Sequence, residues 1–252
     1  HYKNILVHEN TFHNLRSTTH HGGSAIMYNV QDAVFEDNLI YDIDGNGITD
    51  KDDGFRNTYR NNHIFDCDRD IMLANQNTQG EVNLHHNLIY NCGFALAIGW
   101  QPGFLRDVYI HRNTLLGPLL FGRVLHENPA CYNLNVFANI IGDGQVMPYQ
   151  FNPVEAGKRY VYPSYVLNPK DHTVRIDNNL LWAADAETVA GHEWGIPPMS
   201  LADWRKANFD LSSVLVEPDF NVDYSLSEDN QYRGQYGRDG SGFPLPALPK
   251  AP

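Results

Sequence analysis

An asparagine recurs along the first 180 residues in a constant setting. Each copy is a short alternating run that reaches the Asn and is followed by one spacer and one or two apolar residues. The anchors are Asn10, Asn38, Asn62, Asn87, Asn113, Asn139 and Asn179, spaced by 28, 24, 25, 26, 26 and 40 residues. A period near 25 with short strands and no helical pattern predicts an all-β parallel β-helix, whose coils of about three strands stack at roughly 4.8 Å.

Stacked coils bring equivalent residues together. The Asn column then predicts an internal side-chain amide ladder, because buried polar groups need hydrogen-bonding partners. Cys67 and Cys92 each lie five residues after an anchor, so we expect two buried thiols on adjacent coils. A leucine-rich repeat does not fit, because the leucine spacing is wrong and no helix follows each strand.

The period breaks after Asn139. Residues 143–172 hold four prolines and predict a long loop excursion over one face. Residues 199–207 predict a short capping helix, with Ser200 as N-cap and Asp203 at the third helical position. We therefore expect β-helix coils over residues 1–182, and a C-terminal capping segment with an extended tail over residues 183–252.

Composition excludes several classes of protein. The chain has 252 residues, a net charge of −12, 42% hydrophobic residues and three cysteines. No apolar run is long enough for a transmembrane helix, and a general nucleic-acid binder needs a basic stripe. We expect no membrane and no nucleic-acid partner, and an extracellular or periplasmic location. The chain opens inside a strand pattern without an initiator Met, so we also expect an upstream domain or further coils.

One candidate site is a column on the strand that precedes each Asn. Residues three before the Asn are apolar and predict the core, so residues two before it point outward. With Tyr109 beside them, they predict a sugar-binding groove or a solvated face. The column consists of His8, Glu36, Arg60, His85, His111 and Phe137.

A second candidate site is acidic. Asp50, Lys51 and Asp52 adjoin each other, with Asp44 upstream and Asp70 one coil later. Acidic neighbours favour the charged form of Lys51, whereas the base of a lyase must lose its proton. A bound calcium ion would neutralise those carboxylates and so remove this obstacle. A hydrolase would instead use two of these carboxylates as acid and base. A charged turn between strands is the alternative without a function.

The repeats resemble the right-handed parallel β-helix of the pectate-lyase superfamily, which is dominated by extracellular polysaccharide-active enzymes. A narrower similarity is to polysaccharide lyase family 6, through Asp50-Lys51-Asp52-Asp53, the run from Asn57 to Ile64, and the run from Leu73 to Asn77. The resemblance places the family's Brønsted base on Lys51. It places a calcium-binding carboxylate on Asp44, and the family's essential Arg on Ala74, which is a departure.

The leading hypothesis is a secreted protein that cleaves a uronate-containing polysaccharide by β-elimination. Lys51 would abstract the proton, Arg60 or Arg69 would bind the carboxylate, and His85 or His111 would assist. The further substrate-binding candidates are Glu36, Tyr109 and Trp100, and calcium is the candidate cofactor. A glycoside hydrolase with an Asp pair remains an alternative. The C-terminal run from Trp204 to Phe220 favours it, because this run resembles the end segment of many secreted β-helix glycosidases. A non-catalytic binding or structural β-helix is the other alternative.

Overall fold

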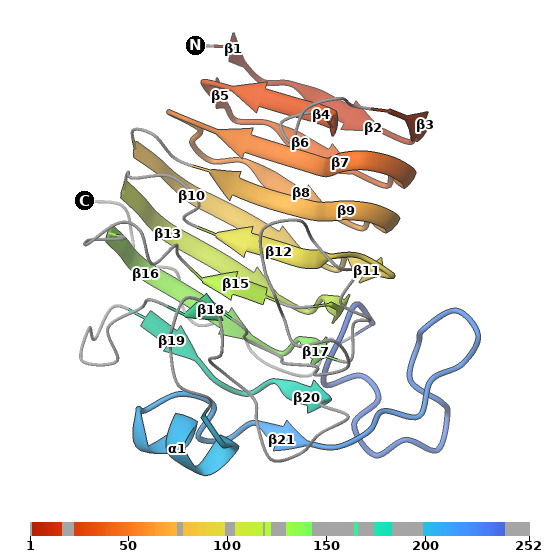
Figure 1. Ribbon diagram of the computed structural model, residues 1–252, viewed down its shortest axis with the longest axis vertical. Coiled ribbons are helices and arrows are strands. Elements are labelled where there is room, and N and C mark those ends of the chain that lie inside the picture. Colours follow the sequence, from red (N-terminus) through yellow and green to blue (C-terminus); the bar gives the residue numbers. More distant parts are fainter. Residues whose placement is uncertain are drawn as a thin grey trace.

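The computed structural model describes residues 2–16, 23–74, 78–98, 104–117, 119–121, 130–142, 164–165, 174–182 and 199–239. The strands stack as successive coils of a parallel β-helix, with the N-terminal strands at one end and the short helix α1 at the other (Figure 1). The predicted all-β fold is confirmed. Within the described residues, no helix has the length and apolar character needed to cross a bilayer.

The strand that leads into each Asn belongs to a seven-stranded parallel sheet. Its strands in spatial order are β2 (Leu6–His8), β6 (Val34–Glu36), β8 (Thr58–Arg60), β10 (Thr78–His85), β13 (Phe104–His111), β16 (Ala130–Phe137) and β19 (Val174–Ile176). Two further short strands, β1 (Tyr2–Lys3) and β5 (Val30–Gln31), pair with each other.

The strands that follow each Asn form a second, twelve-stranded sheet. Two long strands, β7 (Leu39–Lys51) and β9 (His63–Ala74), pair with each other, and each also pairs with two shorter strands in succession. Beside them lie β3 (Thr11–Leu15), β4 (Gly23–Tyr28), β11 (Leu88–Tyr90), β12 (Phe94–Ile98), β14 (Thr114–Leu116), β15 (Leu119–Phe121), β17 (Ile140–Gly142), β18 (Ser164–Tyr165), β20 (Leu180–Trp182) and β21 (Val214–Leu215).

The register of the sheets follows the sequence repeat. In the seven-stranded sheet, Phe35 pairs with Tyr59, Tyr59 with Leu84 and Leu84 with Ile110. All four side chains are buried, as the alternation predicts. Cys67 and Cys92 are also buried as thiols. Burial of such apolar columns at about 25 cal/mol per Å² is the main stabilising contribution to a stack of this kind.

The asparagine ladder is present along the whole stack. The Oδ1 of Asn87 accepts from the backbone N–H of Asn62 at 3.0 Å and from its side-chain amide at 3.0 Å. The Nδ2 of Asn87 donates to the Oδ1 of Asn113 at 2.9 Å and to the carbonyl of Tyr59 at 3.0 Å. The same contacts repeat from Asn10 to Asn179. The ladder therefore satisfies the polar groups that each corner of the coil would otherwise leave buried and unpaired.

The C-terminal segment closes the end of the ladder. α1 (Leu201–Lys206) begins at the predicted N-cap, where the Ser200 Oγ accepts from the backbone N–H of Asp203. Trp204 is fully buried and donates to the Oδ2 of Asp210, and the Asn179 amide donates to the Oδ1 of Asp210. The cap thus supplies the acceptor that a next coil would otherwise provide.

Most of the predicted excursion over residues 143–172 lies outside the described residues. Its described part, β18, pairs in parallel with β15. The tail beyond Asp239 also lies outside them.

Candidate functional site

The outward column on the seven-stranded sheet is assembled as predicted. The strand register places His8 beside Glu36, Glu36 beside Arg60, and Arg60 beside His85. It continues from His85 to His111 and from His111 to Phe137. The column is not a uniformly solvated face, because His111 is only 4% exposed.

A second row of side chains widens this column. The residue directly before each Asn adopts a left-handed conformation with φ between 53° and 57°, as at Glu9, Asp37, His86 and Arg112. This conformation interrupts the strand alternation, so the two residues before the Asn present their side chains to the same neighbours. Strand alternation alone does not predict this second row. The signal for it is the polar residue that precedes most of the anchors.

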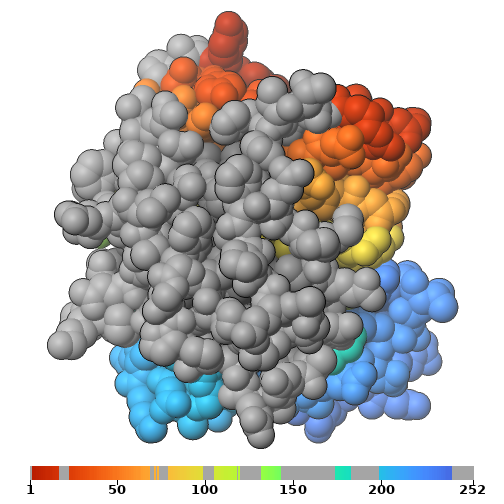
Figure 2. Space-filling model, in the orientation of Figure 1, coloured from red at the N-terminus to blue at the C-terminus, as the bar shows by residue number. Residues whose placement is uncertain are grey.

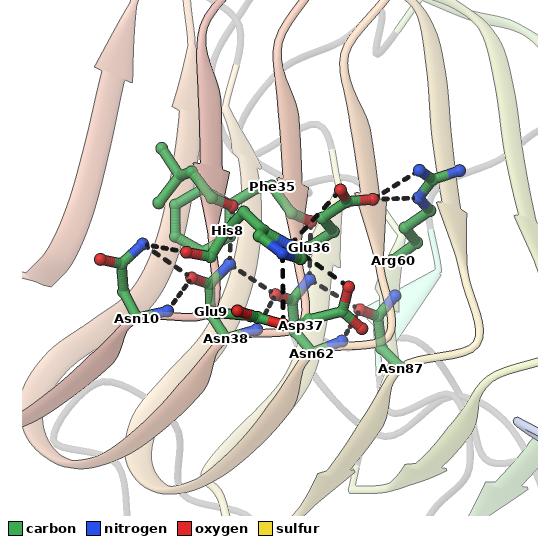
Figure 3. A network of polar contacts seen from close by, with 11 residues as sticks. His8, Glu9, Asn10, Phe35, Glu36, Asp37, Asn38, Arg60, Asn62 and Asn87 are labelled. Atoms are coloured by element: carbon green, nitrogen blue, oxygen red, sulfur yellow. Dashed lines mark hydrogen bonds and ion pairs between the residues drawn. The ribbon is translucent and has the colours of Figure 1, made fainter.

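The N-terminal end of the column is acidic (Figure 3). His8 Nδ1 lies 3.5 Å from Glu36 Oε1 and 3.4 Å from Asp37 Oδ2. His8 Nε2 lies 3.3 Å from Glu9 Oε1. The other oxygen of Glu36, Oε2, accepts from Nε and Nη2 of Arg60, both at 2.5 Å. Arg60 therefore separates this acidic end from the histidines that follow it.

The C-terminal end of the column is a cluster of imidazoles. The His85 and His111 rings stack at 5.1 Å, and the His111 and Phe137 rings stack at 5.2 Å. His85 Nδ1 lies 2.6 Å from His86 Nδ1, and the Nε2 of His111 lies 3.0 Å from Asn83 Oδ1. The stack holds the two rings parallel to each other, with planes 7° apart.

Both stacked histidines have lowered pKa values. Burial, followed by the charges of His86, Arg60 and Arg112, lowers the pKa of His85 from 6.5 to about 4. Burial and the neighbouring His85 lower the pKa of His111 to about 3. Both imidazoles are therefore neutral at pH 7 and able to accept a proton.

Tyr109 lies on the same strand as His111. It is two residues before His111 on β13 and pairs in register with Asn83 and Asn135. The Asn133 amide donates to its hydroxyl at 3.1 Å.

Asp50 does not lie in the charged turn that the sequence suggested. β7 continues through it, and alternation with Ile48 turns its side chain into the core, where its exposed fraction is 0%. The Asn57 amide and the Tyr59 hydroxyl donate to its Oδ2 at 2.9 Å and 2.7 Å. Burial raises the pKa of Asp50 to about 6, against the effect of these hydrogen bonds. A carboxyl without exposure has no direct contact with a polymer.

The other candidates of the acidic site are dispersed. Lys51 ends β7, with its Nζ 5.3 Å from the centre of the Tyr28 ring. Asp52 follows it in the turn with φ 60°. Arg60 ends the next strand, beyond a left-handed bend at Arg56, so Lys51 and Arg60 belong to different sheets. Arg69 and Asp70 lie on β9, but their side chains are outside the described part, and Trp100 is outside it altogether.

The surroundings of Asp44 do not suit calcium. Arg16 Nη1 lies 3.6 Å from Asp44 Oδ1, and the same guanidinium pairs with Asp42 at 2.8 Å. A guanidinium thus faces the two carboxylates, whereas calcium needs six to eight oxygen ligands. The described residues around Asp44 therefore offer no fit for that ion.

A column of rings also covers the outside of the twelve-stranded sheet. The ring centres of His13 and Tyr41 are 5.1 Å apart, those of Tyr41 and Phe65 are 5.2 Å apart, and those of Phe65 and Tyr90 are 5.0 Å apart, all nearly parallel. Tyr224 of the C-terminal segment contacts Tyr90 at 4.5 Å. These rings stack as His85, His111 and Phe137 do on the other sheet, but no guanidinium is among the rings of this column.

Comparison with known proteins supports the fold. Residues 1–115 match the family model described as a right handed beta helix region. No curated protein and no solved structure gave a significant match. The coils therefore form a right-handed β-helix, an architecture that fits carbohydrate-active β-helix proteins in general.

Proposed function

We propose that this right-handed β-helix binds a uronate-containing polysaccharide along the outward column and cleaves it by β-elimination. The observation that carries the proposal is the neutral His85 imidazole next to the Arg60 guanidinium on one face. β-Elimination at a uronate needs these two groups, a cation for the carboxylate and a base for the proton at C5. The proposal also uses the resemblance to pectate-lyase-like enzymes.

Arg60 is the carboxylate-binding group in this mechanism. Its Nε and Nη2 hold Glu36, and its side chain is 44% exposed, so Nη1 remains for a ligand. A guanidinium suits a carboxylate because both are planar and charged. Binding there withdraws electron density from C5 and makes its proton more acidic.

His85 is the base. It takes the C5 proton, the electron pair forms the C4–C5 double bond, and the C4–O bond to the leaving sugar breaks. A proton from the imidazolium or from water then goes to the leaving oxygen. The bound carboxylate offsets the charge of Arg60, one cause of the lowered His85 pKa. Burial is the larger cause, so substrate binding reverses only the part of the lowering that comes from Arg60.

The proposal prefers His85 over Lys51 as the base. Lys51 ends β7 and a turn separates it from the strand of Arg60, whereas His85 and Arg60 are direct neighbours in the sheet. A hydrolase needs two carboxylates on opposite sides of one linkage. In the described column, Glu36 and Asp37 are sequence neighbours that face the same histidine, so they do not flank a linkage from two sides. The hydrolase hypothesis therefore has less support.

The test is a panel of alginate, pectate, chondroitin and neutral glycans, with and without calcium. Cleavage is followed by the ultraviolet absorbance of unsaturated ends and by reducing ends. The lyase proposal expects both signals. Reducing ends without absorbance would indicate a hydrolase, and silence together with measurable glycan binding would indicate a binding module.

Variants then locate the chemistry. His85→Gln should lower kcat by about 10²–10⁴-fold, the usual contribution of a general base. His13→Gln is the matched control, because His13 is an exposed, ring-stacked histidine on the other sheet. A lyase whose rate survives His85→Gln but not Lys51→Ala would return the base to Lys51. An extracellular or periplasmic location accompanies this proposal and is tested by fractionating the native host.

A further inference from the structure

We propose that His8, Glu36 and Asp37 bind a divalent transition-metal ion of the zinc class. The proposal does not rest on the proposed lyase chemistry, although Glu36 also holds Arg60, and the site lies at the acidic end of the column in Figure 3. Each of the three residues offers one ligand atom, and these atoms lie within 4.8 Å of one another.

The spacing of the donor atoms is that of a ligand shell. Zinc binds nitrogen and oxygen at about 2.0–2.1 Å, which places two tetrahedral ligands about 3.3 Å apart. His8 Nδ1 lies 3.5 Å from Glu36 Oε1 and 3.4 Å from Asp37 Oδ2. Both separations are long for a hydrogen bond but close to the spacing of two atoms that share one ion.

The outer contacts of these ligands also fit a metal site. Histidine ligands usually give their second ring nitrogen to a carboxylate, which fixes the ring and its tautomer. His8 Nε2 faces Glu9 Oε1 at 3.3 Å, which leaves Nδ1 as the ligand nitrogen. Glu36 is held in a similar way, because Oε2 is bound by Arg60 and Oε1 remains directed at His8.

The donor set selects the class of ion. Calcium and magnesium prefer oxygen ligands alone, whereas one imidazole with two carboxylates suits zinc and its neighbours in the first transition row. Three carboxylates, Glu9, Glu36 and Asp37, surround one imidazole and one guanidinium, so the local charge is negative without an ion. The side chains of His8 and Asp37 are 39% and 40% exposed, which leaves the ion reachable and lets water complete its coordination.

The test is titration of the full chain with Zn²⁺ alone, by calorimetry and by competition with a chromogenic chelator. Co²⁺ is the second probe, because its visible absorption changes when an imidazole nitrogen replaces water. The expected result is one tight equivalent in the wild type. Affinity should fall at least 100-fold in His8→Ala and at least tenfold in Asp37→Asn.

Two further sets of variants distinguish zinc binding at this site from zinc binding at other histidines. Glu9→Gln, which keeps all three ligands, should weaken binding by about 10–100-fold. His13→Ala and His86→Ala should leave the affinity unchanged. The proposal is overturned if the wild type binds no Zn²⁺, if His8→Ala binds as well as the wild type, or if His86→Ala removes the tight site. Far-UV circular dichroism confirms that each variant is folded. Polysaccharide cleavage is scored separately, so either proposal can fail without the other.

Discussion

Replacing Asn87 by alanine is expected to destabilise the protein by about 3–5 kcal/mol. Asn87 is fully buried in the middle of the ladder. Its Oδ1 accepts two hydrogen bonds from Asn62, and its Nδ2 donates to Asn113 and to the carbonyls of Tyr59 and His85. The substitution removes all five bonds at once.

The magnitude follows from the groups left without partners. The backbone N–H and the amide of Asn62, and the carbonyls of Tyr59 and His85, each lose a bond, and the first three are buried. Asn113 Oδ1 keeps the backbone N–H of Asn87. An orphaned buried polar group costs about 1–3 kcal/mol, so three such groups near the lower end of that range give about 3–5 kcal/mol. For a chain of this size, 3–5 kcal/mol is a fall in Tm of about 6–20 °C.

Asn10→Ala is the matched control, since Asn10 is the same residue type at the solvent-exposed end of the same ladder. Among the described residues, its amide donates to the His8 carbonyl and the Asn38 Oδ1, so its loss should cost less than about 1 kcal/mol. Urea unfolding followed by circular dichroism gives both values. Equal losses in the two variants, or a loss below 1 kcal/mol in Asn87→Ala, would refute the reasoning that the ladder stabilises the coils through buried amides.

Three further predictions concern pH and the cap. The folded pKa of Asp50, about 6, lies above the usual 3.8, so the folded state holds this proton more tightly and the carboxyl makes stability fall as the pH rises from 4 to 6. Asp50→Asn should abolish that contribution, up to about 3 kcal/mol between pH 4 and 7 in paired urea titrations. His111, with a folded pKa of about 3, has the opposite sign: the unfolded chain takes up the proton, so stability falls as the pH drops below 6.5. His111→Phe should reduce this acid sensitivity by about 1.4 kcal/mol per pH unit between pH 6 and 4, and an unchanged slope would contradict the burial argument. Ser200→Ala should cost about 1 kcal/mol in thermal unfolding, because the Ser200 Oγ caps α1, and no measurable loss would mean that the cap adds nothing.

The repeat by itself determined the fold, the ladder and the column. An asparagine about every 25 residues favours one arrangement, in which equivalent side-chain amides form hydrogen bonds between successive coils. Alternation on either side of each Asn then assigns the inward residues, such as Tyr59, and the outward ones, such as Arg60. The N-cap at Ser200 can also be predicted from the sequence, because an N-cap depends on residues within one helical turn.

The tertiary structure decided the details of the candidate sites. Asp50 sits in a sequence of acidic residues typical of a turn, but the neighbouring coils extend β7 through it and bury its carboxyl. Asp37 and His86 join the column because the residue before each Asn turns left-handed, which strand alternation does not foresee. The meeting of His8 with Glu36 and Asp37 depends on both effects together. Register brings residues 28 positions apart into one column, and the local backbone conformation decides which side chains meet there.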